Sequence, residues 1–197
     1  MRKHFQISED KIPTIEQIQS ELNRLKYNRD YRRTLYNTIS SLIVVAAIAV
    51  LISMLFLPVL RVTGTSMTPT LMNDELVICN KRSNFKNGDI VAFYFNNKIL
   101  LKRVIGVAGD IIDIKDDGTV YVNGMILDEP YLSEKSFSEC DIELPYQVPD
   151  NRIFVMGDHR STSVDSRSTT VGCIADEYII GKVILRIYPF NQIGTIN

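Results

Sequence analysis

The chain has 197 residues, of which 45% are hydrophobic and 23% charged, with 10 Gly and 7 Pro. This length allows one globular unit plus an extra segment, and this composition excludes a disordered or collagen-like chain. The net charge of -1 argues against a dedicated nucleic-acid binder, which usually carries a basic excess.

Residues 1–38 predict a short amphipathic helix. Thr14 and Gln17 have capping-box spacing, and apolar residues then recur every three or four positions. These residues are Ile15, Ile18, Leu22 and Leu25. Two interpretations stay open: a helix that binds a partner, or a helix that lies on the membrane surface or frays in solvent.

An apolar segment follows, in which only Ser53 and Pro58 of residues 42–60 are not plainly apolar. As a helix with a rise of about 1.5 Å per residue it reaches about 28 Å, close to the roughly 30 Å hydrocarbon core of a bilayer. A buried helix of a soluble protein seldom runs so long without a polar face. No small-x-small site follows the segment, so we expect residues 39–60 to form an uncleaved transmembrane anchor.

Basic residues are distributed unequally around the predicted anchor. Four precede it closely, and one follows it within 20 residues. They are Lys26, Arg29, Arg32 and Arg33 before the anchor, and Arg61 after it. By the positive-inside rule, residues 1–38 are cytoplasmic, and residues 61–197 lie outside the cytoplasm at the plasma membrane.

The exterior part predicts a mainly β fold. Seven short apolar runs fit strands: 75–79, 90–95, 99–107, 111–115, 119–127, 153–156 and 179–188. Turn dipeptides such as Asn123-Gly124 separate them. With no helical pattern between the runs, we expect an antiparallel sandwich or barrel-like domain, with a smaller inserted region at about 112–150.

Cys79, Cys140 and Cys173 all lie in this exterior part. Their odd number and the lack of a C-x-x-C motif disfavour a disulfide framework and a cysteine-rich zinc site. We expect neither a metal nor a cofactor.

His159 is the one histidine in the exterior part, so few side chains there could act as a general base. A lysine that is held neutral is a further candidate. Strand alternation puts Lys102 on one face with Leu100, and Arg103 on the other. If either face packs on the core, one cation is buried with it, and lysine gives up its proton far more readily than arginine. The alternative is that Lys102 extends to solvent from an edge strand.

A nucleophile candidate lies close to the predicted anchor. Ser66 follows Leu60 by six residues, which span at most about 20 Å even when fully extended. Its hydroxyl is therefore held near the membrane surface, where a site would meet membrane-tethered substrates.

Four segments, in this order, resemble the type I signal peptidases: 64–71 (GTSMTPTL), 87–91 (NGDIV), 102–110 (KRVIGVAGD) and 157–167 (GDHRSTSVDSR). Each alone is weakly specific, but four in register are strongly specific. The similarity extends from about residue 42 to 194, and so covers the anchor and nearly all of the exterior part.

The resemblance implies roles for matching residues. Ser66 would be the acylating nucleophile, Lys102 its general base, and Ser163 a partner that orients the lysine amine. The ion-pairing residues would hold the last segment against the strand of Lys102; they are Arg103, Asp158, Asp165 and Arg167. The Ser66 N–H would be an oxyanion donor, and Met67 and Leu100 are candidates to line shallow pockets for small residues.

Two positions depart from the family pattern. Gly64 stands where many bacterial members have a serine hydroxyl as oxyanion donor, so the second donor stays open. His159 replaces the usual asparagine. It either adjusts hydrogen bonds in its loop or serves as the base of a histidine-dependent variant.

The expected function is a membrane-anchored serine endopeptidase that removes N-terminal signal peptides from exported preproteins after Ala-x-Ala-type sites. Preproteins and the lipid bilayer would be its partners, without nucleic acid or metal. A soluble serine-lysine repressor protease is disfavoured by the anchor. The alternative from another class is a catalytically inactive, membrane-tethered β domain that binds export or envelope proteins.

Overall fold

The computed structural model describes residues 13–81, 84–137 and 140–196. The chain divides after Ile52 into two units, which we describe separately.

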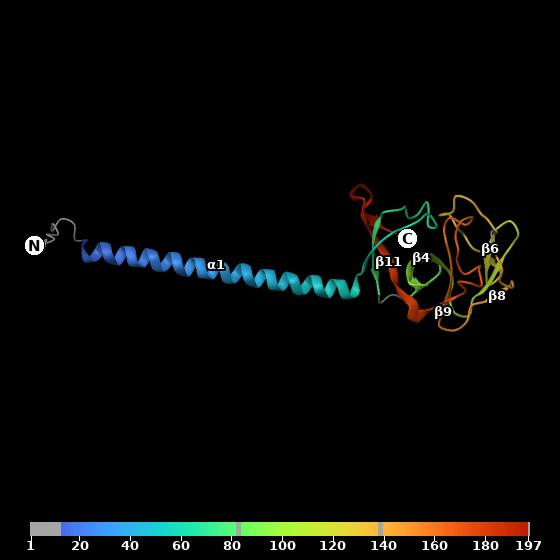
Figure 1. The fold of residues 1–197 in the computed structure, drawn as a ribbon, viewed down its shortest axis with the longest axis horizontal. Helices are drawn as coiled ribbons and strands as arrows, with labels where there is room; N and C mark the ends of the chain where they lie inside the picture. The colour runs from blue at the N-terminus through green and yellow to red at the C-terminus, as the bar shows by residue number, and fades with distance from the viewer. Residues whose placement is uncertain (1–12, 82–83, 138–139, 197) are drawn as a thin grey trace, which may run out of the picture. The chain divides into compact units, whose positions relative to one another are not determined.

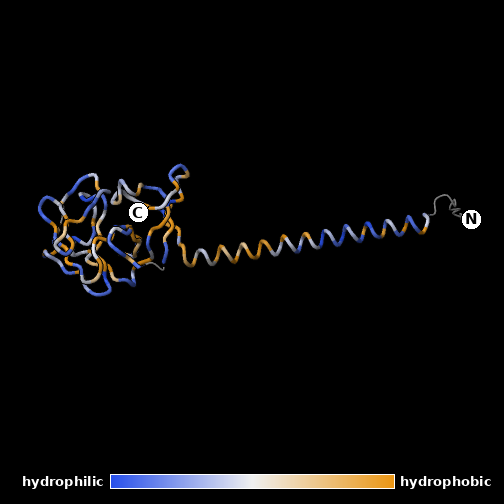
Figure 2. Tube along the Cα trace, turned by 180° about the vertical axis from the view of Figure 1, so that it is seen from behind, coloured by the Kyte–Doolittle hydropathy of each residue, from blue (hydrophilic) through white to orange (hydrophobic). Residues whose placement is uncertain are grey.

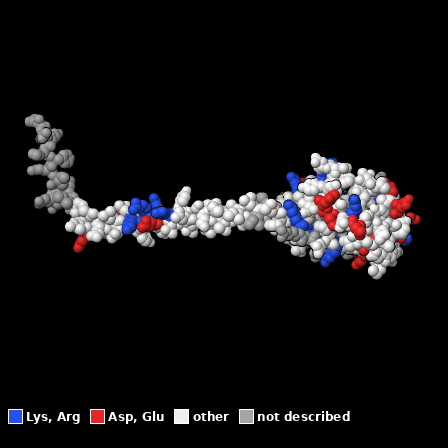
Figure 3. Space-filling view, turned by 90° about the horizontal axis from the view of Figure 1, so that it is seen from below, with Lys and Arg blue, Asp and Glu red and all other residues white. Residues whose placement is uncertain are grey.

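Helix α1 (Ile15–Phe56) accounts for the N-terminal part of the described chain. The predicted capping box is confirmed: the Thr14 N–H donates to Gln17 Oε1 (3.1 Å), and the Gln17 N–H to Thr14 Oγ1 (3.4 Å). The prediction of a separate short helix is wrong, because no helix break divides it from the apolar segment. Figure 3 shows charged side chains on the first part of α1, and Figure 2 shows its apolar second part.

Helix α1 is long and apolar enough to cross a bilayer, and its apolar side chains are exposed. It does not include the whole segment 39–60, because it ends at Phe56 and Val59 begins a strand. Pro58 accounts for this boundary, since proline disfavours helical geometry in the residue before it and has no N–H to donate.

The second unit contains two antiparallel sheets. The larger has the order β1-β2-β11-β3-β4-β9-β10, with β12 also paired to β11. Its strands are β1 (Val59–Arg61), β2 (Leu76–Asn80), β3 (Ile90–Phe95), β4 (Lys98–Gly106), β9 (Arg152–Met156), β10 (Ile174–Ala175), β11 (Ile179–Tyr188) and β12 (Gly194–Thr195). Two 3-10 turns, η2 (Asp176–Tyr178) and η3 (Phe190–Gln192), precede and follow β11.

The smaller sheet has the order β7-β6-β5-β8. Its strands are β5 (Ile111–Ile114), β6 (Val120–Val122), β7 (Met125–Ile126) and β8 (Tyr146–Gln147). Asn123 and Gly124 have φ values of 53° and 76°, as the hairpin between β6 and β7 requires. In Figure 1, β6 and β8 lie on the side of this unit away from β11.

The seven predicted strand regions are confirmed, and the mainly antiparallel fold with them. Sequence reasoning missed β1, β8, β10 and β12, which have two or three residues each. Such lengths are too short for an alternating pattern to be recognised.

Strand β4 lies in the middle of the larger sheet, between β3 and β9. Its two faces contribute to different hydrophobic clusters, Val104 to one and Ile105 to another. Both faces are therefore covered, and Lys102 (3% exposed) and Arg103 (2% exposed) are both buried. The alternative in which Lys102 extends to solvent from an edge strand is wrong.

Candidate functional site

Lys102 is a buried amine with a single described hydrogen-bond partner: its Nζ lies 2.9 Å from Ser163 Oγ. Burial lowers the pKa of Lys102 to about 8; Asp165 and Asp158 oppose this change, and Arg167 adds to it. At pH 7 about one molecule in ten then has a neutral amine, against about one in 2,500 for an ordinary lysine. The environment of Lys102 therefore favours the neutral amine, which is the form that can accept a proton.

Ser66 lies in a loop that we call the nucleophile loop, residues 62–75 between β1 and β2. Two backbone hydrogen bonds close its neck, from Val62 N to Glu75 O (2.8 Å) and from Asp74 N to Val62 O (2.9 Å). Met67, directly after Ser66, is buried in a hydrophobic cluster with Leu71. Ser66 itself is half-buried, so its hydroxyl is held by a packed loop and still borders a pocket.

Gly157 brings the segments of Ser66 and Ser163 together. A Cβ atom at this position would lie 2.6 Å from the Ser66 carbonyl oxygen and would also collide with the Ser163 side chain. The His159 N–H donates to the same Ser66 carbonyl (3.0 Å). The described contacts include no direct hydrogen bond between Ser66 Oγ and Lys102 Nζ, as is common in catalytic sites without substrate.

A pocket of about 530 Å³ borders Ser66. Its walls are β1 with the start of the nucleophile loop, and the β3–β4 turn with the first residues of β4. Met67 and Leu100, the two pocket candidates from the sequence, both line it. Among the described strands β1 pairs with β2 alone, which leaves its other edge unpaired there, beside the pocket.

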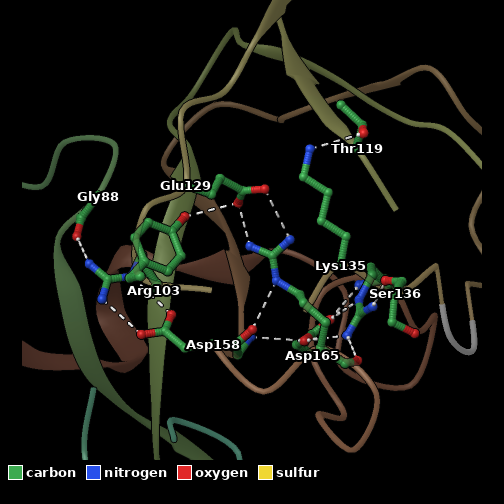
Figure 4. Close-up of polar contacts among 12 residues, drawn as sticks. Gly88, Arg103, Thr119, Glu129, Lys135, Ser136, Asp158 and Asp165 are labelled. Carbon is green, nitrogen blue, oxygen red and sulfur yellow. Dashed lines mark hydrogen bonds and ion pairs between the residues drawn. The ribbon is translucent and has the colours of Figure 1, made fainter. Parts of the chain in front are cut away.

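Arg103 and Asp158 form a buried two-point ion pair. Arg103 Nε and Nη2 donate to the two carboxylate oxygens at 2.9 and 2.8 Å, and Nη1 donates to Gly88 O at 2.7 Å (Figure 4). Thr70, in the nucleophile loop, donates its hydroxyl to Asp158 (2.5 Å). Asp158 thus connects the segment 157–167 with β4 and with the nucleophile loop.

Arg167 and Asp165 do not hold this segment against β4 as expected. Arg167 Nε donates to Asp165 Oδ1 (2.8 Å), and its Nη2 donates to the carbonyls of Arg160 and Ser163. Asp165 also accepts from the Gly157 N–H (3.0 Å). These contacts lie within one segment, because Asp165 is only two residues from Arg167, so this pair shapes the loop that carries Ser163.

Sequence reasoning missed a second set of buried polar contacts. Glu129 pairs with Arg160, and Tyr131 donates its hydroxyl to Glu129 (2.9 Å) while its ring lies 3.8 Å from the Arg103 guanidinium carbon. Arg160 Nε in turn donates to Gly157 O (3.0 Å). No sequence signal marks this pairing, since Glu129 and Arg160 are 31 residues apart.

The two departures from the family pattern have defined contacts. His159 Nδ1 lies 2.9 Å from Thr162 Oγ1 and 3.3 Å from Ser161 Oγ, so the described contacts of the ring stay within its own loop. The Gly64 N–H donates to Asn73 Oδ1 (2.9 Å), with φ at 91°. That N–H is therefore already used within the loop, and the second oxyanion donor stays open.

The sequence matches the family described as "Signal peptidase, peptidase S26" over residues 35–188. It is 38% identical over 176 residues to signal peptidase I of Bacillus licheniformis, which covers 82% of this chain and 93% of the relative. Signal peptidase I S of Bacillus subtilis is 34% identical over 183 residues, 86% of this chain and 98% of the relative. A crystal structure of a signal peptidase I from Enterococcus faecalis is 29% identical, covering 51% of this chain and 97% of that chain, with a TM-score of 0.44.

These matches cover most of the chain and nearly the whole length of the relatives. They assign the chain a serine peptidase activity that removes signal peptides from preproteins. With the apolar helix α1, it is a single-pass membrane protein. The chain belongs to the signal peptidase family, peptidase S26, as a signal peptidase I.

Proposed function

We propose that this signal peptidase cleaves with Ser66 as the nucleophile and Lys102 as the general base. The environment of Lys102 is the observation that carries the proposal. Its amine is buried, has a pKa of about 8 and lies 2.9 Å from the Ser163 hydroxyl. Ser163 in turn meets the Ser66 backbone at Gly157, where no side chain fits between the two segments.

In the proposed reaction, neutral Lys102 accepts the proton of the Ser66 hydroxyl as its oxygen attacks the scissile carbonyl. The resulting ammonium donates that proton to the leaving amine, which completes the acyl-enzyme. Water then hydrolyses the ester with Lys102 again acting as the base, and Ser66 is regenerated. The Ser66 N–H donates to the oxyanion, and one such donor typically contributes about 3 kcal/mol.

The pocket supports a substrate that binds as an extended strand. The free edge of β1 provides backbone donors and acceptors for such a strand. Met67 and Leu100 would then line shallow apolar pockets that accept alanine at the first and third positions before the cut. This geometry favours Ala-x-Ala sites.

The charge distribution supports an orientation in the membrane. Five basic residues lie on the first part of α1, ahead of its apolar part, and the positive-inside rule places them in the cytoplasm. The catalytic domain, residues 61–197, then lies outside the cytoplasm, on the side where exported preproteins emerge.

The test is cleavage of a preprotein with an Ala-x-Ala site by the full chain in detergent. The wild type is compared with Lys102→Arg, which keeps charge and reach but cannot become neutral, and with Lys115→Arg at an exposed position as a control. Cleavage by the wild type and the control alone supports the proposal.

Equal cleavage by Lys102→Arg would remove Lys102 as the base and favour His159. Failure of all three proteins would favour the inactive binding domain instead. A serine-directed acylating probe that labels the wild type and not Ser66→Ala identifies the nucleophile independently.

A further inference from the structure

The nucleophile loop is closed at its neck, but its far side needs separate support. Its two neck hydrogen bonds join residues near Val62 and Glu75, at the ends of the loop. Ser66 and Thr70 lie between these ends, beyond the reach of the neck contacts. What holds Thr70 therefore contributes to where Ser66 lies.

Arg186, on β11, contacts both the far side and the neck of this loop. Its Nη2 donates to the Thr70 carbonyl (2.9 Å), and its Nη1 donates to the Glu75 carboxylate (3.0 Å) and to Gln192 Oε1 (2.8 Å). One guanidinium thus joins the middle of the loop to its end. The hydroxyl of Thr70 is held separately by Asp158.

Two overlapping turns connect Thr70 to Ser66. The Thr68 N–H donates to Thr65 O (3.1 Å), and the Leu71 N–H donates to Met67 O (2.9 Å). The first hydrogen bond closes a turn that contains Ser66, the second closes a turn that contains Thr70, and the two turns share Met67 and Thr68. A shift of the Thr70 carbonyl is therefore transmitted to the Ser66 backbone and not absorbed between them.

We propose that Arg186 is a positioning residue for the reaction: by clamping Thr70 to Glu75 it sets the position of Ser66 relative to Lys102. This inference rests on the proposed function, in which Ser66 is the nucleophile. The clamp depends on the planar fork of arginine, which presents several donors in fixed directions. A lysine has the charge but not this geometry, so it cannot replace all three contacts.

Burial decides which substitution tests the clamp. Glu75 is 3% exposed, and its Oε2, like Arg186 Nε, has no hydrogen-bond partner among the described residues. Deleting the cation would leave a buried carboxylate unpaired and destabilise the fold. Arg186→Lys keeps the charge beside Glu75 and removes the fork, so it separates positioning from folding.

The matched control lies on the same strand. Lys182 forms a partly buried ion pair with Asp89 (2.6 Å), a residue outside the nucleophile loop. Lys182→Arg therefore replaces a lysine with an arginine in a partly buried ion pair on the same strand, without changing a contact of Thr70.

The experiment follows Ser66 acylation by a serine-directed probe in the full chain in detergent, with thermal unfolding measured in parallel. For Arg186→Lys we expect the labelling rate at saturating probe to fall at least about tenfold, because a displacement of about 1 Å can cost this much or more. The half-saturating probe concentration should stay within about twofold of the wild-type value, because the substitution does not touch the pocket. The midpoint of the pH profile should stay within about 0.3 pH units, because the substitution does not touch Lys102. Lys182→Arg labels like the wild type.

An unchanged labelling rate in Arg186→Lys would overturn the proposal, as would an equal loss in Lys182→Arg or a loss explained by the unfolded fraction. Amide hydrogen exchange supplies a second measurement, with faster exchange expected in residues 62–75 of Arg186→Lys. If the wild type is not labelled at Ser66, the proposed function fails. Unchanged exchange would, by itself, refute the clamp.

Discussion

Replacing Ser163 with alanine removes the only described hydrogen-bond partner of the Lys102 amine. The 2.9 Å contact is buried, so the substitution leaves the amine without this partner where little solvent reaches it. A buried donor left without a partner costs about 1–3 kcal/mol. If that cost falls on the step in which Lys102 accepts the Ser66 proton, it corresponds to a loss of about 5- to 150-fold in rate.

The assay is single-turnover acylation of Ser66 at saturating probe. We expect Ser163→Ala to lose rate within this range while its half-saturating concentration changes little, because Ser163 does not line the pocket. Ser161→Ala, an exposed serine of the same segment, is the control and keeps the wild-type rate. Full activity of a folded Ser163→Ala variant would refute the role assigned to this hydroxyl.

Three further predictions concern Lys102 and Gly157. Because the pKa of Lys102 is about 8 and its neutral form is the proposed base, acylation should rise about tenfold from pH 7 to pH 9; a flat profile contradicts this. Burial in the folded state disfavours the charged form of Lys102. The resulting loss of folding stability is fully present below about pH 8 and is relieved as the pH rises from about 8 to 10.5. Lys102→Met should therefore raise the free energy of unfolding at pH 7 by up to about 3 kcal/mol, and denaturant titrations at pH 7 and 10 should show the gain shrinking. Gly157→Ala should abolish labelling of Ser66, since its Cβ meets the Ser66 carbonyl, whereas Gly194→Ala, with nothing within 4 Å, should label normally.

The parts of the fold that follow a local pattern could be predicted from the sequence. Alternating apolar residues and Asn-Gly turns located the longer strands, and the spacing of Thr14 and Gln17 located the start of α1. Helix α1 ends before the predicted end of the anchor, because hydropathy continues past Pro58 although the helix does not. Apolar composition measures what can enter a bilayer, whereas a helix boundary depends on backbone geometry.

The candidate site was predictable only in part, because alternation describes one strand and not its neighbours. It indicated that Lys102 and Arg103 occupy opposite faces, but it could not show that both faces of β4 are covered. The contacts of Arg186 with Thr70 and of Glu129 with Arg160 join residues 116 and 31 positions apart. Such pairs become visible only when the topology is known.

The contacts of Asp158 have a consequence for when the chain becomes an enzyme. Asp158 joins Thr70 and Arg103, so three distant parts of the polypeptide must meet before the site exists. Until β9 and the segment after it have docked, we expect Lys102 to be hydrated, with a neutral amine in about one molecule in 2,500 at pH 7. With Ser66 and Lys102 as the proposed catalytic pair, we expect a chain in which these parts have not yet met to carry both residues without protease activity. On the proposed mechanism, proteolytic activity is a property of the completed fold and is expected late in biogenesis.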